Sequence, residues 1–427
     1  MEISKIHSLY LTCHSIVIDT RKIVKNSLFV ALKGERFDAN TFASEALEKG
    51  ASYVLIDDSF YYVDDRTILV ENTLSTLQEL AKFHRNFLGI PIVALTGSNG
   101  KTTTKELINV VLSKKFNTKA TIGNLNNHIG VPLTLLSFDK SNEIGIVEMG
   151  ANHQKEIEFL CQIAQPDFGY ITNFGKAHLE GFGGVEGVIK GKSEMYDYLK
   201  LHNKQVFVNL DDPIQNEKTT SLDRITFSQK NNDSFLFIQD ITANPFVIIK
   251  FNEIEINSHL IGLYNANNIN AASVIGLYFG VSSLEIKNAI ESYIPENNRS
   301  QLIKKGSNDI LLDAYNANPS SMKVAIENFV QLKNESKLMI LGDMFELGDE
   351  SNQEHIDIIK QVSINQNVKV IFVGNYFYSN KIEQSNLLFF ETFEAISSYM
   401  TDNVPINSIV LIKGSRGMQL ERILDLL

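Results

Sequence analysis

The chain has 427 residues, of which 44% are hydrophobic and 21% are charged, so it has the composition of a globular protein and the length for roughly two to four domains. Its 39 Lys and Arg residues against 50 Asp and Glu residues give a formal net charge of −11, which argues against a nucleic-acid-binding protein. The two cysteines, Cys13 and Cys161, offer neither a disulfide framework nor a metal-ligand spacing, and we interpret both as buried thiols.

The sequence shows no membrane or export signal. No stretch approaches the roughly 18 consecutive apolar residues of a membrane span. The N-terminus lacks the charged and then apolar pattern of a signal peptide. We therefore expect no membrane span and a cytoplasmic location.

Residues 1 to about 85 mix short strands with one helix. We expect the strands at 15–19, 27–32, 53–56 and 67–70 and the helix near 42–49. Thr20 and Arg21 follow the first strand, and Lys33 stands at a later turn. Such side chains can hold a pyrophosphate and a ribose or uracil edge. They can also form a solvated turn with an ion pair, and composition alone favours that second interpretation.

A glycine-rich string follows, between a predicted strand and a predicted helix. Residues 94–104 read Ala-Leu-Thr-Gly-Ser-Asn-Gly-Lys-Thr-Thr-Thr, after an apolar run at 90–95 and before a helix-compatible segment at 102–114. Gly97 and Gly100 allow the backbone to curl so that its N–H groups surround a polyphosphate. The helix N-terminus adds partial positive charge.

Two side chains strengthen this interpretation as a phosphate-binding loop. Lys101 can reach the outer phosphates, and Thr102 supplies the hydroxyl that such loops give to magnesium. Leu95 stands where the full phosphate-loop pattern has glycine. An ordinary strand–helix turn is the alternative, but the flanking elements favour a site for a nucleoside triphosphate and magnesium.

Four titratable side chains, at three places, follow the loop helix. Residues 144–148 form an apolar strand that ends in Glu148, which a parallel sheet would place at its carboxyl edge as a magnesium ligand. His178 lies in a glycine-rich loop after the next strand and, by itself, is as readily a structural group. Lys192 and Glu194 on the following helix could, from the residues alone, be an exposed charged stretch.

Side-chain amides cluster at two places. Asn124 and Asn127 belong to a string of amides and glycines at 123–136, which indicates a substrate-facing loop, although turns use the same residues. Asn265 and Asn268 lie three apart at a helix start and therefore on one face. Their amides suit an adenine edge. N-capping would account for one of them.

From about residue 299 strands and helices alternate, which predicts a doubly wound parallel sheet. The apolar strands are expected at 310–313, 337–341, 368–373 and 408–412. Polar loops follow three of these strand ends, at 313–319, 342–348 and 413–417, and should line one face of the domain. In the last loop Lys413 and Arg416 are candidate clamps for a carboxylate or phosphate, or else solvated cations.

Taken together, these strings resemble the Mur ligases of peptidoglycan synthesis throughout the chain. Family-level signs are the phosphate loop at 96–102, Glu-Met-Gly at 148–150, His178, Lys192, and Asn265 with Asn268. More specific strings resemble the members that add D-alanyl-D-alanine; they are Asp-Ala-Tyr-Asn-Ala-Asn-Pro-Ser-Ser-Met at 313–322, Leu-Gly-Asp-Met-Phe-Glu-Leu-Gly at 341–348 and Lys-Gly-Ser-Arg at 413–416.

The resemblance implies a three-domain α/β enzyme. Its parts would be a small UDP-substrate-binding domain (1–85), a central parallel-sheet ATP-binding domain with the phosphate loop (86–298) and a C-terminal Rossmann-like domain that contacts dipeptide and ATP (299–427). It implies an ATP-dependent amide ligase that joins D-Ala-D-Ala to UDP-N-acetylmuramoyl-tripeptide through an acyl phosphate. We expect a monomer.

The resemblance also implies roles for individual residues. Thr102 and Glu148 would hold one of two magnesium ions, and His178 with a carbamylated Lys192 would serve the other. Lys101 would contact the β- and γ-phosphates. The catalytic residues would be Lys101, Glu148, His178 and Lys192. ATP would contact Gly97, Ser98, Asn99, Gly100, Lys101, Thr102, Thr103, Asn265, Asn268, Arg299, Asp313, Tyr315 and Asn316. The substrates would contact Thr20, Arg21 and Lys33 at the UDP end, Asn124 and Asn127 along the muramyl peptide, and Asn318, Lys413 and Arg416.

The chain departs from the family pattern at three places. Thr20 replaces a serine, Asn40 replaces a histidine, and Tyr264 replaces the usual histidine before Asn265. Two alternatives stay open. The chain could be another amide ligase of the superfamily, such as a different muramyl ligase or a folylpolyglutamate synthase, or it could be a switch-type NTPase that hydrolyses nucleotide without an amine acceptor. The third residue of the tripeptide, lysine or diaminopimelate, is also open.

Overall fold

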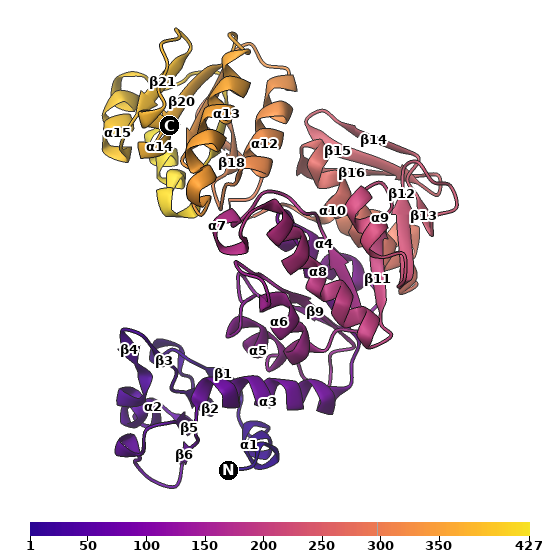
Figure 1. Ribbon diagram of the computed structural model, residues 1–427, viewed down its shortest axis with the longest axis vertical. Helices are drawn as coiled ribbons and strands as arrows, with labels where there is room; N and C mark the ends of the chain where they lie inside the picture. The colour runs from indigo at the N-terminus through magenta and orange to yellow at the C-terminus, as the bar shows by residue number, and fades with distance from the viewer. Residues whose placement is uncertain (297) are drawn as a thin grey trace.

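The computed structural model describes residues 1–296 and 298–427 and has three α/β domains arranged in a row (Figure 1). The N-terminal domain is built on a four-stranded parallel sheet in the order β1-β2-β5-β6. Its strands are β1 (Ser15–Val17), β2 (Ser27–Val30), β5 (Ala51–Ile56) and β6 (Thr67–Leu69), with the hairpin β3 (Lys33–Gly34) and β4 (Phe37–Asp38) beside them. Its helices are α1 (Ile3–Tyr10) and α2 (Ala43–Glu48).

The long helix α3 (Thr73–Leu88) joins this domain to the central one. Asn72 caps its start by accepting a hydrogen bond from Ser75 N at 2.8 Å, and Gly89 ends it with a φ of 64°. Its apolar face packs against α1 on one side and α5 on the other, so α3 belongs to both domains.

The central domain carries a seven-stranded sheet, parallel throughout, in the order β13-β12-β11-β10-β7-β9-β8. Its strands are β7 (Ile92–Thr96), β8 (Thr118–Ala120), β9 (Ile144–Glu148), β10 (Phe168–Ile171), β11 (Gln205–Asn209), β12 (Asp223–Ser228) and β13 (Leu236–Phe237). Its helices are α4 (Lys101–Leu112), α5 (Gly130–Leu135), α6 (Glu156–Ala164), α7 (Leu179–Phe182), α8 (Val185–Leu201), α9 (Pro213–Lys218), α10 (Ala266–Tyr278) and α11 (Ser283–Ser292).

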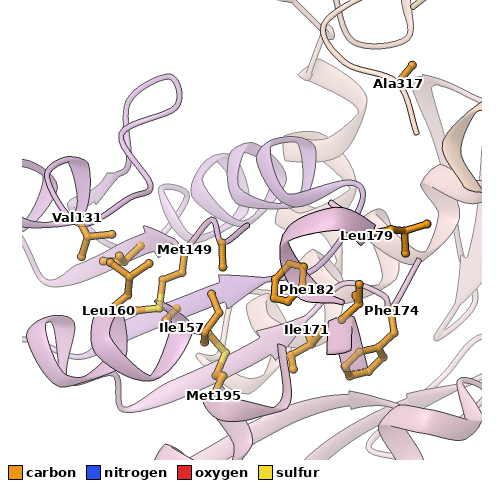
Figure 2. Packing of buried hydrophobic residues seen from close by; sticks show 14 of the residues in the cluster. Val131, Met149, Ile157, Leu160, Ile171, Phe174, Leu179, Phe182, Met195 and Ala317 are labelled. Carbon is orange, nitrogen blue, oxygen red and sulfur yellow. The ribbon is translucent and has the colours of Figure 1, made fainter. Parts of the chain in front are cut away.

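Both faces of this sheet are covered by helices, which is why its strands are continuous apolar runs. Alternate residues of β7 point to opposite faces: Ala94 packs with α5, α6 and α8, while Val93 and Leu95 pack with α4, α10 and α11. Figure 2 shows part of the first of these cores, to which Met149, Phe182 and Met195 belong. This core fixes the position of α8.

The C-terminal domain has a six-stranded sheet in the order β17-β18-β22-β19-β20-β21, in which β17 alone is antiparallel to its neighbour. Its strands are β17 (Gln301–Lys305), β18 (Asn308–Asp313), β19 (Lys337–Gly342), β20 (Lys369–Val373), β21 (Leu387–Phe390) and β22 (Ile409–Lys413). Its helices are α12 (Pro319–Gln331), α13 (Ser351–Ser363), α14 (Asn375–Ser379) and α15 (Phe393–Asp402).

The predicted α/β class and the strands around the phosphate loop are confirmed. A three-stranded antiparallel sheet, formed by β14 (Asp240–Ala243), β15 (Phe246–Phe251) and β16 (Ile254–Ile261), had no counterpart in the expected elements. Cys161 is buried as expected, whereas Cys13 is only half-buried, so that expectation is wrong for Cys13. Within the described residues no helix is long and apolar enough to cross a membrane.

Candidate active site

A cavity of about 810 Å³ lies between the carboxyl edge of the central sheet and the C-terminal domain. Its walls include these sequence-predicted residues: Ser98, Asn99, Gly100, Lys101, Thr102, Thr103, Asn124, Asn127, Glu148, His178, Asn265, Asn268, Arg299, Asp313, Tyr315, Asn316, Asn318, Lys413 and Arg416. The other predicted residues, Gly97, Lys192, Thr20, Arg21 and Lys33, do not line it.

The phosphate loop requires glycine at two positions. Gly97 has a φ of 139° and Gly100 a φ of 78°. Residues with a Cβ rarely adopt such backbone conformations. A Cβ at Gly97 would lie 2.0 Å from Thr172 Oγ1. A Cβ at Gly100 would lie 2.6 Å from Asn268 Oδ1. The end of β10 and the start of α10 therefore crowd the loop so closely that only bare backbone fits.

Positive charge gathers around this loop. Lys101 Nζ donates to Gly97 O at 2.7 Å, so the side chain folds back over the loop. Burial lowers the pKa of Lys101 from its ordinary value, Glu148 opposes the shift, and Arg299 adds to it. Two cations close enough to perturb each other favour an anion between them, and the N-terminus of α4 adds to the same potential.

Glu148 ends β9 with a buried carboxylate. Its register partner on β7 is Leu95, so the carboxylate lies beside the entrance to the phosphate loop. Oε1 accepts a hydrogen bond from Asn126 Nδ2 at 2.8 Å, and no described residue hydrogen-bonds to the buried Oε2. A buried carboxylate oxygen without a donor is unfavourable unless a cation or ligand meets it.

His178 stands at the start of α7 with a φ of 53°. Its Nδ1 faces the carboxylate of Glu346, which follows β19 of the C-terminal domain. This contact lowers the pKa of Glu346. Lys176 of the same central loop pairs with Glu354 on α13. The loop after β10 thus joins the two domains.

Lys192 is buried on α8, behind the cavity wall. It is 1% exposed, and its Nζ donates to Ala151 O at 3.3 Å and lies 4.9 Å from the centre of the Phe182 ring. Burial, with the nearby charge of Lys101, lowers the pKa of Lys192 well below its ordinary value. The interpretation of Lys192 and Glu194 as exposed charges is wrong, since Glu194 is also buried and accepts two backbone N–H groups at the start of α6.

The donor set fits magnesium only in combination with a nucleotide. In the part of the chain that the structure describes, no three His, Cys, Asp or Glu residues gather in a way that could hold a metal ion. Glu148 nevertheless offers a free oxygen, and Thr102 lines the same cavity. Magnesium in nucleotide sites commonly takes one or two protein oxygens and completes its shell with phosphate and water.

Asn265 and Asn268 hold α10 against the phosphate loop. Asn268 Nδ2 donates to Asn265 Oδ1 at 2.8 Å, which confirms that the two share a helix face. Asn268 Oδ1 accepts from Thr104 Oγ1 on α4 at 3.0 Å. The Tyr264 hydroxyl lies 2.8 Å from Ser300 Oγ, near the start of the C-terminal domain.

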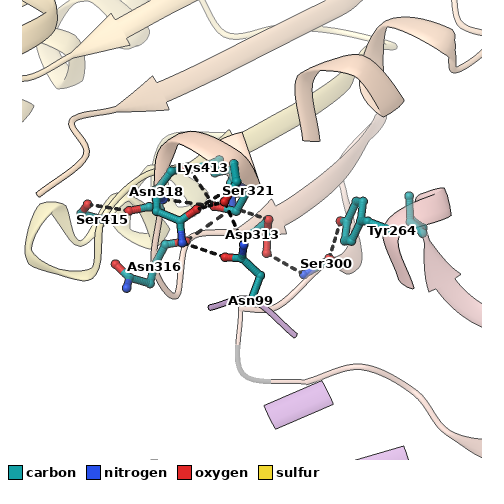
Figure 3. A network of polar contacts seen from close by, with 12 residues as sticks. Asn99, Tyr264, Ser300, Asp313, Asn316, Asn318, Ser321, Lys413 and Ser415 are labelled. Carbon is teal, nitrogen blue, oxygen red and sulfur yellow. Dashed lines mark hydrogen bonds and ion pairs between the residues drawn. The ribbon is translucent and has the colours of Figure 1, made fainter. Parts of the chain in front are cut away.

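The C-terminal wall is a polar network (Figure 3). Lys413 is 2% exposed and its Nζ lies 2.6 Å from Asp313 Oδ2, so its charge is already met by a carboxylate. Tyr315 lies between two cations: Arg299 stacks 3.6 Å from the ring centre, and Arg416 donates to the hydroxyl at 3.0 Å. Cation–π contact fixes the Tyr315 ring over the cavity.

The predicted UDP-binding residues lie outside this cavity, on the N-terminal domain. Arg21 pairs with Asp19 at 2.7 Å, and Lys33 pairs with Asp38 at 3.2 Å, both at exposed turns. Asn40 is buried, and its Nδ2 donates to Asp57 Oδ1 at 2.8 Å. Asn40 therefore has a structural role that holds two loops of this domain together.

The sequence analysis did not single out Asn126 or Asn173. Asn126 orients Glu148, as described above, and Asn173 supports the backbone of the phosphate loop. Asn127, by contrast, was predicted to contact substrate, and its Oδ1 accepts from the N–H groups of Ile129 and Gly130 at 3.1 and 2.9 Å. The many amide side chains indicated that the loop belongs to the site, but they did not indicate which amide has which role.

Comparison with protein families agrees with this geometry. The model for the "Mur ligase family, catalytic domain" matches residues 12–85, that for the "Mur ligase middle domain" matches 95–276, and that for the "Mur ligase, glutamate ligase domain" matches 298–416. The chain belongs to the Mur ligase family, and it is an ATP-dependent amide ligase.

Similar proteins extend over nearly the whole chain. A UDP-N-acetylmuramoyl-tripeptide–D-alanyl-D-alanine ligase of Bacillus subtilis is 34% identical over 96% of this chain and 92% of its own length. The Escherichia coli enzyme of the same name is 31% identical over 97% and 93%. A crystal structure of MurF from Acinetobacter baumannii superposes with a TM-score of 0.88 at 29% identity, over 99% and 97%. MurF from Thermotoga maritima in complex with ADP gives 0.84 at 28%, over 98% and 97%.

Proposed function

We propose that this enzyme joins D-alanyl-D-alanine to UDP-N-acetylmuramoyl-tripeptide and converts ATP to ADP and phosphate, forming the UDP-N-acetylmuramoyl-pentapeptide of peptidoglycan synthesis. The observation that carries the proposal is the cavity between two domains. One wall is the phosphate loop, and the other is built from 313–321 and 413–417, the loops with the subfamily-specific strings.

The reaction has two steps whose atoms balance without an external redox partner. The tripeptide carboxylate attacks the γ-phosphorus of ATP, which gives an acyl phosphate and ADP. The dipeptide amine attacks the acyl carbon, phosphate leaves from the tetrahedral intermediate, and the amine loses a proton. The first step brings two anions together, and in the second step negative charge develops on the tetrahedral intermediate and the leaving phosphate. Preorganised positive charge therefore lowers both barriers. Lys101, Arg299 and the N-terminus of α4 supply it around the phosphates.

We further propose two magnesium ions. Thr102 and Glu148 would hold one, and His178 with Lys192 would hold the other. Lys192 as an ammonium ion has donors only, whereas its carbamate would supply the carboxylate oxygens that magnesium prefers. Bound magnesium would supply charge neutralisation between the carboxylate and the γ-phosphate.

The remaining residues receive their proposed roles from the resemblance to the family. Asn265 and Asn268 would lie near the adenine, and Arg299 and Asp313 near the ribose or phosphates. Tyr315, Asn316 and Asn318 belong to the loop where ATP and the peptide substrates would meet, with Lys413 and Arg416 beside it. We place the UDP end at Thr20, Arg21 and Lys33 and the muramyl peptide along Asn124 and Asn127. We expect the enzyme to act as a cytoplasmic monomer.

Phosphate release tests the proposal. The enzyme is incubated with ATP, magnesium and UDP-N-acetylmuramoyl-tripeptide, with and without D-alanyl-D-alanine. Release that requires both substrates is expected, and parallel reactions with lysine- and diaminopimelate-containing tripeptides identify the third residue. Release without any amine acceptor would instead indicate a switch-type NTPase. Release with a single amino acid in place of the dipeptide would indicate another amide ligase of the family.

A further inference from the structure

A closed ring of three hydrogen bonds joins the phosphate loop to the C-terminal domain. Figure 3 shows two of its members, Asn99 and Asn318, facing each other. Asn318 Nδ2 donates to Asn99 Oδ1 at 2.7 Å, and Asn99 Nδ2 donates to Ser320 Oγ at 3.0 Å. Ser320 Oγ in turn donates to Asn318 Oδ1 at 2.9 Å. Each side chain donates one bond and accepts one in the same direction around the ring, so the three bonds strengthen one another.

The phosphate loop does not need the Asn99 side chain for its own shape. The backbone oxygen of Asn99 accepts from Thr172 Oγ1 at 2.6 Å and from Asn173 Nδ2 at 3.0 Å. The backbone N–H of Asn99 donates to Asn173 Oδ1 at 3.2 Å. All three bonds come from the end of β10, within the central domain. Both polar ends of the Asn99 amide are therefore free to serve the other domain.

The C-terminal side of the ring is fixed in the same way. Asn318 caps α12, and its Oδ1 also accepts from Ser321 N at 2.9 Å. An N-cap is held by the helix that it starts, so Asn318 presents its Nδ2 in a defined direction. Asn99 thus contacts a rigid partner and not a flexible loop.

Gly175 leaves the space in which this contact forms. A Cβ at Gly175 would lie 2.5 Å from Ser320 Oγ and 2.7 Å from Asn99 Nδ2. The loop after β10 thus passes directly beside the ring, and even a methyl group there would separate two of its members.

We propose that Asn99 is a positioning residue that couples the phosphate loop to the C-terminal domain. Through Asn318 and Ser320 it holds the loop after β18 over the nucleotide, where the acyl phosphate must meet the dipeptide amine. This inference rests on the proposed function for its kinetic consequence, but the coupling itself concerns the two domains alone. It gives the side chains of Asn99 and Asn318 a role toward each other, so the contact predicted between Asn99 and ATP would come from the backbone of the loop.

The first test uses Asn99→Ala. The variant keeps the backbone bonds of the loop and loses both side-chain bonds to the C-terminal domain. We expect kcat for ligation to fall roughly tenfold, as two neutral hydrogen bonds are lost, while the Kd for ADP stays within about twofold of the wild type. Small-angle scattering with ADP and UDP-N-acetylmuramoyl-tripeptide should show a larger radius of gyration than for the wild type.

Ser137→Ala provides the matched control for domain closure. Its hydroxyl donates to Thr134 O at 2.7 Å, inside the central domain and outside the walls of the cavity, so its removal should leave the scattering curve unchanged. Gly175→Ala reaches the ring by a different route and should open the domains in the same way. In the Asn99→Ala background Gly175→Ala should add little, because the two changes break one contact.

The outcomes separate the inference from the proposed function. A wild-type enzyme that does not ligate would contradict the proposed function, while scattering and ADP binding still test the coupling. Asn99→Ala with wild-type kcat and wild-type scattering would overturn the inference. So would a loss of ADP affinity as large as the loss of kcat, since that would place the side chain in the nucleotide site itself.

Discussion

Asn126 Nδ2 holds one carboxylate oxygen of Glu148 at 2.8 Å and, among the described residues, leaves the other oxygen without a donor. The amide therefore orients the carboxylate and leaves it available to a ligand. A side chain that hydrogen-bonds to a metal-binding residue and orients it contributes to metal affinity, although it does not touch the metal.

Glu148→Gln should reduce kcat for ligation by about 100-fold or more, because the neutral amide removes a charge placed in a water-poor site. The amide has nearly the shape of the carboxylate, and its oxygen can still accept from Asn126. The melting temperature should therefore change little. Ligation measured over a series of magnesium concentrations would show the loss as a weaker response to the ion, and an unchanged magnesium dependence would contradict the assignment.

Asn126→Ala tests the orientation of the Glu148 carboxylate separately from its charge. The carboxylate stays but loses the amide that directs it, so we expect a loss of roughly 10- to 100-fold in activity or magnesium affinity. If Asn126→Ala were as damaging as Glu148→Gln, the amide itself would have to contact substrate.

Gly97→Ala should abolish nucleotide binding and destabilise the central domain, because its Cβ would overlap Thr172 Oγ1 at 2.0 Å in a backbone conformation with a φ of 139°. Gly89→Ala is the matched control, since Gly89 has a positive φ of 64° but no atom within 4 Å of an added Cβ. It should cost about 1 kcal/mol of stability and leave ADP binding intact. Thermal unfolding and ADP titration on both variants measure the difference.

Local patterns were sufficient to predict much of the fold. The strand before the phosphate loop and the helix after it follow from an apolar run, two glycines and a helix-compatible segment, and all are present as β7 and α4. The alternation after residue 299 likewise predicted four parallel strands of the C-terminal sheet, β18, β19, β20 and β22, but not the parallel strand β21. These features depend on periodicity within short windows, which a single sequence contains.

Contacts between distant segments could not be predicted in this way. Asn99 and Asn318 are 219 positions apart, and nothing in either string indicates that their amides meet. The burial of Lys192 is a second case, since Lys190 and Lys192 lie two positions apart on the same helix, in the same short stretch of sequence. The structure shows that Lys190 is exposed and Lys192 is buried, because the face of α8 that carries Lys192 and Met195 packs into the core beside Phe182.

Lys192→Ala should abolish ligation, and short carboxylates such as acetate or formate should partly restore it if a carbamate is lost. Lys190→Ala on the exposed face of α8 should keep full activity and show no response to these acids. Ligation assayed with and without the additives measures both effects. Full activity of Lys192→Ala without additive would mean that the buried amine has no part in the reaction.

Acid should loosen the contact between the N-terminal and central domains. His84 Nε2 lies 2.9 Å from Phe138 O and must donate there, so His84 Nδ1 accepts from His7 Nε2 at 3.0 Å. Burial, with the charge of His84 nearby, lowers the pKa of His7 to about 4, and burial also lowers the pKa of His84.

The direction in which stability changes with pH follows from proton binding. The unfolded chain takes up protons near pH 6.5 and the folded chain only nearer pH 4, so this stabilisation is complete above about pH 6.5 and is lost as the pH falls toward 4. For His7 the difference reaches up to about 3 kcal/mol. The first thermal transition should therefore shift to lower temperature over this range. His7→Phe should reduce the shift, because an aromatic ring that cannot be protonated then packs against α3. A variant with the same pH dependence as the wild type would contradict the assignment to this pair.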